Sequence, residues 1–174
     1  MTSRYGGDVP ADDQTIAAPD GTHLAVRVRG ADPRFLLVHG LASNARLWDG
    51  MADALAERGH GSVTVDQRGH GRSDKPGTGF DFATLAEDLA TVVGEWGGPV
   101  VAVGQSWGGN VVLEFAARHP ELVSAVVCVD GGFIRLGHAF ADREVMLEAL
   151  APPRFEGLRR VDLEAGMRAR LDGW

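Results

Sequence analysis

A glycine-rich hexapeptide near the middle of the chain, residues 104–109 (GQSWGG), constrains the fold more than any other stretch. An apolar run, 99–103, precedes it and a segment with helical spacing, 110–119, follows it, so G-x-S-x-G stands between a strand and a helix. The turn is so sharp that side chains beside Ser106 would collide with neighbouring backbone, which explains the glycines. It also lifts the serine hydroxyl from the sheet edge and aims the positive end of the helix at it. The pattern predicts a nucleophilic serine, and a purely structural glycine-rich turn is the alternative.

Segments with strand and helix character alternate along the rest of the chain. A Pro-Asp-Gly turn at 19–21 between 15–18 and 23–29 predicts a hairpin. This alternation favours an α/β fold with a mostly parallel sheet, helices on both faces and the hairpin as its antiparallel edge. The predicted strands are 35–38, 63–65, 99–103 and 124–129, and the predicted helices are 47–58, 82–96 and 110–119.

Two of these helices have recognisable faces. The segment 47–58 places apolar residues at helical spacing, and Asn44 is its expected N-cap. The segment 82–96 has a longer apolar face and ends at Gly97, Gly98 and Pro99. The apolar positions are Leu47, Met51, Ala54 and Leu55 in the first helix, and Leu85, Leu89, Val92, Val93 and Trp96 in the second.

Composition excludes several classes of function. The 174 residues suffice for one domain with a core, and 24 acidic against 17 basic residues give a net charge of -7, which argues against nucleic acid as a partner. The single cysteine, Cys128, lies in an apolar run and is expected to be a buried strand residue. No metal-ligand cluster or nucleotide-binding fingerprint occurs, so no cofactor is expected. Without a secretory signal or an apolar run long enough to span a membrane, the chain is predicted to be cytoplasmic.

Two further motifs accompany the serine turn. His39-Gly40 follows the apolar strand 35–38, and residues 66–73 (DQRGHGRS) follow the strand 63–65. With these motifs the chain resembles the α/β-hydrolase family, in the branch that has serine as nucleophile. The dehalogenase and epoxide-hydrolase branches resemble it but place aspartate at the same turn.

The resemblance implies a hydrolase that attacks a small ester or related carbonyl substrate through Ser106. The backbone N–H of Trp107, fixed by the turn itself, is one expected oxyanion donor. By resemblance the other is the N–H of Leu41, although His39-Gly40 could merely end a strand. Within residues 66–73, Asp66 and Arg68 are expected to hold the loop together by hydrogen bonds or an ion pair.

The acid and the base of the triad are less well marked. The family order is nucleophile, acid, histidine, and Asp130, at the end of strand 124–129, occupies a position that some members use for the acid. An ordinary Asx turn at Asp130 is the alternative. His70 precedes the nucleophile, which is against this order. Downstream of Ser106 only His119 and His138 remain, and neither follows a strand.

Relatives of this family continue through more cap and further strands. We therefore expect residues 1–132 to form an incomplete hydrolase core and residues 133–174 to begin a helical cap. Strand 124–129 would then be an uncovered sheet edge, which predicts marginal stability and self-association. The competing hypothesis is a truncated, catalytically inactive hydrolase-like fragment or binding protein that lacks the catalytic histidine.

Overall fold

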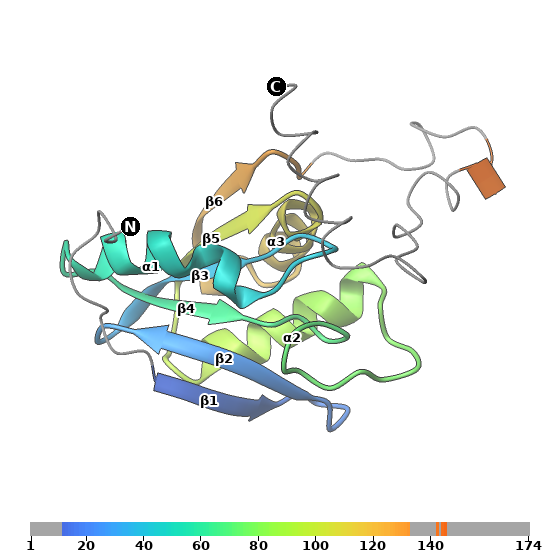
Figure 1. The fold of residues 1–174 in the computed structure, drawn as a ribbon, viewed down its shortest axis with the longest axis horizontal. Coiled ribbons are helices and arrows are strands. Elements are labelled where there is room, and N and C mark those ends of the chain that lie inside the picture. Colours follow the sequence, from blue (N-terminus) through green and yellow to red (C-terminus); the bar gives the residue numbers. More distant parts are fainter. Residues whose placement is uncertain (1–11, 133–141, 143, 146–174) are drawn as a thin grey trace, which may run out of the picture. The chain divides into compact units, whose positions relative to one another are not determined.

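A mixed sheet of six strands organises the part of the chain that the computed structural model describes, residues 12–132 together with Asp142, Glu144 and Val145. Contacts divide the chain into two units, Met1–Ile134 and Arg135–Trp174, and the sheet belongs to the first (Figure 1). The predicted division into a core, 1–132, and a cap, 133–174, stays a prediction, because the cap lies almost wholly outside the described residues.

The order of the strands in the sheet is β1-β2-β4-β3-β5-β6. The strands β4, β3, β5 and β6 run parallel to one another, and β2 pairs antiparallel with both β1 and β4. This arrangement confirms the predicted α/β fold with a hairpin at its antiparallel edge. The strands are β1 (Asp12–Ala17), β2 (His23–Arg29), β3 (Pro33–Val38), β4 (Gly61–Val65), β5 (Val100–Gln105) and β6 (Val123–Val129).

Helices cover both faces of the sheet. Helix α1 lies on one face, and α2 and α3 pack side by side on the other (Figure 1). Each of the three connects two strands that run parallel, which is the crossover connection expected for such a sheet. The helices are η1 (Ala45–Trp48), α1 (Asp49–Ala56), α2 (Phe82–Gly94), α3 (Trp107–Arg118) and η2 (Pro120–Leu122), where η marks a short 3₁₀ turn.

The core consists of two apolar clusters, one on each face of the sheet. Leu36 and Val38 of β3 belong to the larger cluster, which contains the buried faces of α2 and α3. Leu37, between them in sequence, belongs to the smaller cluster with Trp48 and Ala52. Successive side chains of a strand point to opposite faces, so a strand covered on both sides is apolar throughout.

The buried face of the first helical segment differs in part from the predicted one. Leu55 packs against the smaller apolar cluster as predicted, but Leu47 and Met51 are exposed, and the buried side chains are Ala45, Trp48 and Ala52. The segment begins as the 3₁₀ turn η1, capped by the Asn44 side chain, which accepts a hydrogen bond from the Arg46 N–H. Because a 3₁₀ turn repeats every three residues and an α-helix every 3.6, starting with η1 shifts the inward-facing positions.

Strand β6 is the last strand of the described sheet. It ends the strand order and pairs only with β5 among the described strands, and Val127 and Val129, on one of its faces, are 43% and 40% exposed. The prediction of an edge strand is thus confirmed for the described residues, and self-association through it stays a prediction.

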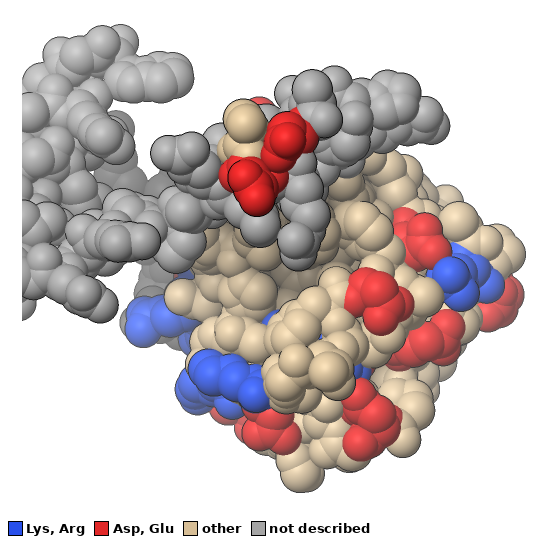
Figure 2. Space-filling view, turned by 90° about the vertical axis from the view of Figure 1, so that its right-hand side faces the viewer, with Lys and Arg blue, Asp and Glu red and all other residues tan. Residues whose placement is uncertain are grey.

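Charge on the described surface is mixed. Acidic and basic side chains lie interspersed on the face drawn in Figure 2, in line with the net charge of -7. No described helix is both long and apolar enough to cross a bilayer. Within the described ranges, no group of three or more histidine, cysteine or acidic side chains is placed to hold a metal ion.

Candidate active site

Ser106 occupies a strained position between β5 and α3. Its φ is 50° and its ψ is -118°, a conformation that non-glycine residues rarely adopt, and it is the N-cap of α3. Its backbone N–H donates to the Val129 carbonyl at 2.9 Å, and its carbonyl accepts from the Gly109 N–H at 2.9 Å. These two bonds hold the strained residue between β6 and the first turn of α3.

Glycines allow the backbones around Ser106 to approach one another closely. A Cβ atom added to Gly108 would lie 2.5 Å from the carbonyl oxygens of both Val38 and His39. One added to Gly131 would lie 2.5 Å from Ser106 Cα. The end of β3 therefore packs against the first turn of α3, and the turn after β6 packs against Ser106. Only glycine fits at positions 108 and 131.

The two expected oxyanion donors lie beside this turn. A Cβ atom added to Gly40 would be 3.2 Å from Ser106 Cβ, so the loop that carries Leu41 packs against the serine. Neither the Leu41 N–H nor the Trp107 N–H donates to any described residue. Unpaired N–H groups are what an oxyanion hole requires, so the roles of Leu41 and Trp107 stay a prediction that these contacts allow.

An aromatic contact fixes the first turn of α3. The Trp107 ring stacks on Phe82, the first residue of α2, with 4.6 Å between ring centroids and 29° between planes. The sequence pattern did not reveal this pair, because it joins two helices whose relative position depends on the whole sheet. The stack orients Trp107, whose N–H is one of the two expected donors.

His39 is a buried structural residue. Its Nδ1 lies 2.7 Å from the Gly40 carbonyl, and its Nε2 accepts from the Gln67 N–H at 3.1 Å. A carbonyl only accepts and an N–H only donates, so these contacts require the neutral ring with its proton on Nδ1. The Gln67 side chain also donates to the His39 carbonyl at 2.6 Å. These bonds fix the loop before Leu41.

Burial lowers the pKa of His39 below the usual value for histidine. In the unfolded chain the pKa of a histidine is about 6.5. The neutral His39 ring therefore takes up its second proton at a higher pH in the unfolded chain than in the folded protein. The stability that neutral His39 contributes is present above that pH and is lost as the pH falls toward the lowered pKa. We expect the free energy of unfolding, measured with urea, to fall more between about pH 7.5 and about pH 5.5 for the wild type than for His39→Gln. Equal losses would contradict this assignment.

Two further described histidines contact groups other than Ser106. His70 Nδ1 lies 3.1 Å from the Arg68 carbonyl, and its Nε2 contacts the Leu41 carbonyl. His119 lies 3.0 Å from Glu87 Oε1 at the far end of α3. That helix has 12 residues, which places its ends about 18 Å apart at 1.5 Å per residue. His138 lies outside the described residues.

Asp130 lies in the turn directly after β6, with a positive φ of 50° and an exposed side chain. Its carboxylate makes no hydrogen bond to a described residue. The neighbouring Gly131 packs on Ser106, so the structure brings the turn that carries this carboxylate to the nucleophile candidate. The three segments that carry the predicted site residues thus meet at one end of the parallel strands, where α/β sheets bind ligands.

The loop 66–73 is held by buried polar contacts. The two carboxylate oxygens of Asp66 accept the N–H groups of Ala45 at 2.7 Å and Arg72 at 2.9 Å. Arg68 does not pair with Asp66, since its guanidinium forms a bidentate pair with Asp88 of α2, with both distances 2.6 Å. Asp66 thus holds the loop together through Arg72, as expected, and also ties it to the segment that begins η1 through Ala45, whereas the ion pair of Arg68 joins the loop to α2.

The comparisons with known proteins agree with this geometry. The family model described as alpha/beta hydrolase fold matches residues 33–171. The chain belongs to this family. A 2-(acetamidomethylene)succinate hydrolase from Mesorhizobium japonicum is 38% identical over 108 residues, which cover 62% of this chain and 38% of that protein. A non-heme haloperoxidase from Rhodococcus erythropolis is 37% identical over 105 residues, which cover 60% and 38%. The chain thus spans well under half the length of these curated relatives.

Solved structures of other α/β-hydrolases resemble this chain. An esterase from Exiguobacterium antarcticum has a TM-score of 0.67 at 27% identity, covering 79% of this chain and 59% of that one. The epoxide hydrolase VrEH1 from Vigna radiata has a TM-score of 0.66 at 27% identity, covering 71% and 39%. Relatives with different activities therefore share this scaffold, so the choice between those activities has to be argued from the site.

Proposed function

We propose that this α/β-hydrolase acts on a small ester or related carbonyl substrate, with Ser106 as the nucleophile. The observation that carries the proposal is the strained Ser106 at the N-terminus of α3, with the loop that leads to Leu41 packed against it. The backbone N–H groups of Leu41 and Trp107 are the donors that form the oxyanion hole. A hydroxyl at this position supports acyl transfer, since a carbonyl bound there has its oxygen at the donors and its carbon at Oγ.

The proposed reaction has two halves. Ser106 Oγ attacks the carbonyl carbon while a histidine takes its proton, and the carbonyl oxygen becomes an oxyanion held by the two N–H groups. The alcohol then leaves with that proton, and water hydrolyses the acyl-enzyme in the same way. Asp130 is the proposed acid that orients the histidine. Within this chain His138 is the remaining downstream candidate for the base, because His119 is engaged with Glu87 at the far end of α3.

Hydrolysis of p-nitrophenyl acetate tests this proposal. We expect Ser106→Ala to reduce the rate to that of the oxyanion hole alone, a fall of about 10³-fold or more. Ser124→Ala, which changes an exposed serine of β6, is the matched control and should leave the rate unchanged. A Ser106→Ala variant as active as wild type would overturn the proposal.

A second function, a hydrolase-like binding protein without chemistry, is favoured by one observation. Ser106 Oγ has no hydrogen-bond partner among the described residues, and each described histidine contacts other groups. In that case the wild-type protein and Ser106→Ala would hydrolyse the ester equally slowly, while circular dichroism showed both to be folded. The same assay therefore distinguishes the two functions.

A further inference from the structure

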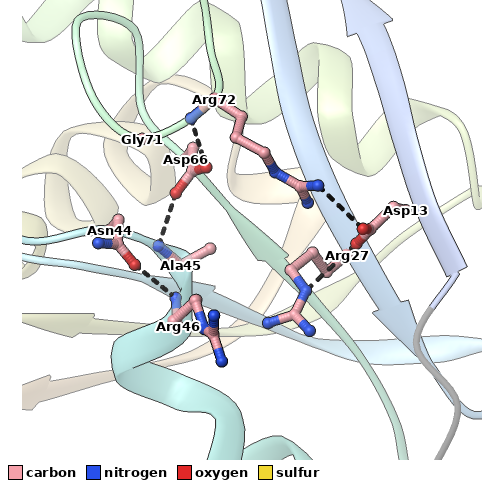
Figure 3. Close-up of a pocket in the computed structure, with 8 residues that line it drawn as sticks. All are labelled: Asp13, Arg27, Asn44, Ala45, Arg46, Asp66, Gly71 and Arg72. Atoms are coloured by element: carbon pink, nitrogen blue, oxygen red, sulfur yellow. Dashed lines mark hydrogen bonds and ion pairs between the residues drawn. The ribbon is translucent and has the colours of Figure 1, made fainter.

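A cavity of about 350 Å³ opens on the α1 side of the sheet, apart from the Ser106 turn (Figure 3). Its walls come from β1, β2, the segment that begins η1 and the loop after β4. Three of its side chains are arginines, which come from three different elements. The lining residues are Asp13, Arg27, Asn44, Ala45, Arg46, Asp66, Gly71 and Arg72.

Two of the arginines hold a carboxylate between them. Arg27 Nε donates to Asp13 Oδ1 at 3.2 Å, and Arg72 Nη1 donates to Asp13 Oδ2 at 3.0 Å (Figure 3). The hydrogen bond from Arg72 lowers the pKa of Asp13, so this side chain is an anion at neutral pH. Asp13 lies on the edge strand β1 and is half-exposed, so it can leave this position by a change of its own side-chain torsion.

The acidic groups around the cavity leave many arginine donors unused. Asp66 accepts two backbone N–H groups with its two oxygens. Asp49 accepts Arg27 Nη1 at 2.5 Å, and its other oxygen lies 3.4 Å from Arg46 Nε. Arg27 Nη2, both Nη atoms of Arg46, and Nε and Nη2 of Arg72 have no hydrogen bond to a described residue. These five nitrogen atoms can only donate; those of Arg27 and Arg72 belong to the guanidinium groups that hold the Asp13 carboxylate, and Arg46 lines the same cavity with a side chain that is 80% exposed.

We propose that this cavity is a binding site for a small oxyanion, whose oxygen atoms replace the Asp13 carboxylate between Arg27 and Arg72. The internal carboxylate shows that the two guanidinium groups stand at the separation that an oxyanion bridges. A phosphate group or a free carboxylate supplies the same acceptors, and planar guanidinium groups bind both. The proposal is independent of the chemistry at Ser106.

Isothermal titration with inorganic phosphate tests the site. Asp13→Asn removes the competing charge from an exposed pair, and should tighten phosphate binding by roughly three- to fivefold. Adding Arg72→Gln to that variant should weaken binding below the wild-type level. Arg34→Gln is the matched control, because Arg34 pairs with Asp32 and does not line the cavity. It should leave the affinity unchanged.

Titrations with succinate, and with chloride at the same ionic strength, identify the bound group. Phosphate bound more tightly than succinate indicates a phosphate group, and the reverse order indicates a carboxylate; both support an oxyanion site. The proposal is overturned if Asp13→Asn and wild type bind phosphate equally, if Arg72→Gln has no effect, or if chloride produces the same heat. Circular dichroism of each variant verifies that a loss of binding is not a loss of fold.

Discussion

Asp88→Ala should lower the free energy of unfolding by about 3 to 5 kcal/mol, because it leaves a buried guanidinium without its main partner. Arg68 is only 1% exposed, and its bidentate contact with Asp88 is the strongest reason that its pKa is raised. The half-exposed Asp20 also accepts from Arg68 Nη1 at 2.8 Å, but it supplies a single hydrogen bond. Urea denaturation followed by circular dichroism measures the change.

The adjacent residue on α2 provides the control. Glu87 lies 3.0 Å from His119 in a pair whose carboxylate is half-exposed, so Glu87→Ala should cost no more than about 1 kcal/mol. Replacing both buried partners, as in Arg68→Met with Asp88→Leu, should recover most of the loss, because no uncompensated charge remains. A loss for Asp88→Ala as small as that for Glu87→Ala would show that Arg68 is not held as described.

Gly108→Ala should cost about 3 kcal/mol, because the added methyl group meets backbone atoms that cannot move independently. The carbonyl oxygens of Val38 and His39 would lie 2.5 Å from it. Both belong to the end of β3 and the loop that leads to Leu41, so relief of the clash also displaces the proposed oxyanion donor. Thermal and urea unfolding give the change in stability.

Gly50→Ala makes the same substitution where there is space. An added Cβ at Gly50 meets no atom within 4 Å, and Gly50 lies inside α1. Alanine is favoured over glycine in a helix, so this variant should gain about 0.5 to 1 kcal/mol. The changes in the free energy of unfolding of Gly108→Ala and Gly50→Ala are expected to differ in sign. Similar effects at both positions would contradict the close packing of β3 against the first turn of α3.

Patterns within a few residues predicted most of the fold. The alternation of apolar residues in 23–29 and the turn at 19–21 predicted the hairpin, and Leu24 and Val26 are fully buried. Apolar runs predicted the parallel strands, because a strand covered on both faces buries its side chains on both sides and these are apolar. The spacing predicted the inward position of Leu55 but not those of Ala45 and Trp48, because these two residues lie in a 3₁₀ turn, which repeats every three residues rather than every 3.6.

In the candidate site, too, the sequence predicted features that depend on neighbouring residues and did not predict contacts between residues far apart in the chain. The G-x-S-x-G pattern marks Ser106 and Trp107, because the strain and the glycines that relieve it are close in sequence. The pairing of Arg68 with Asp88 and the stacking of Trp107 on Phe82 join residues at least twenty positions apart, and no local pattern indicates them. The base is not marked either, because a histidine becomes a base only through a three-dimensional contact with the serine.

The most direct test of the account is the intact mass of the protein after incubation with a fluorophosphonate. This reagent reacts with an activated serine whatever the natural substrate is. We predict a single adduct on the wild-type protein and on Ser124→Ala, and none on Ser106→Ala. An adduct that persists in Ser106→Ala, or no adduct on wild-type protein that circular dichroism shows to be folded, would contradict the assignment of Ser106 as the nucleophile.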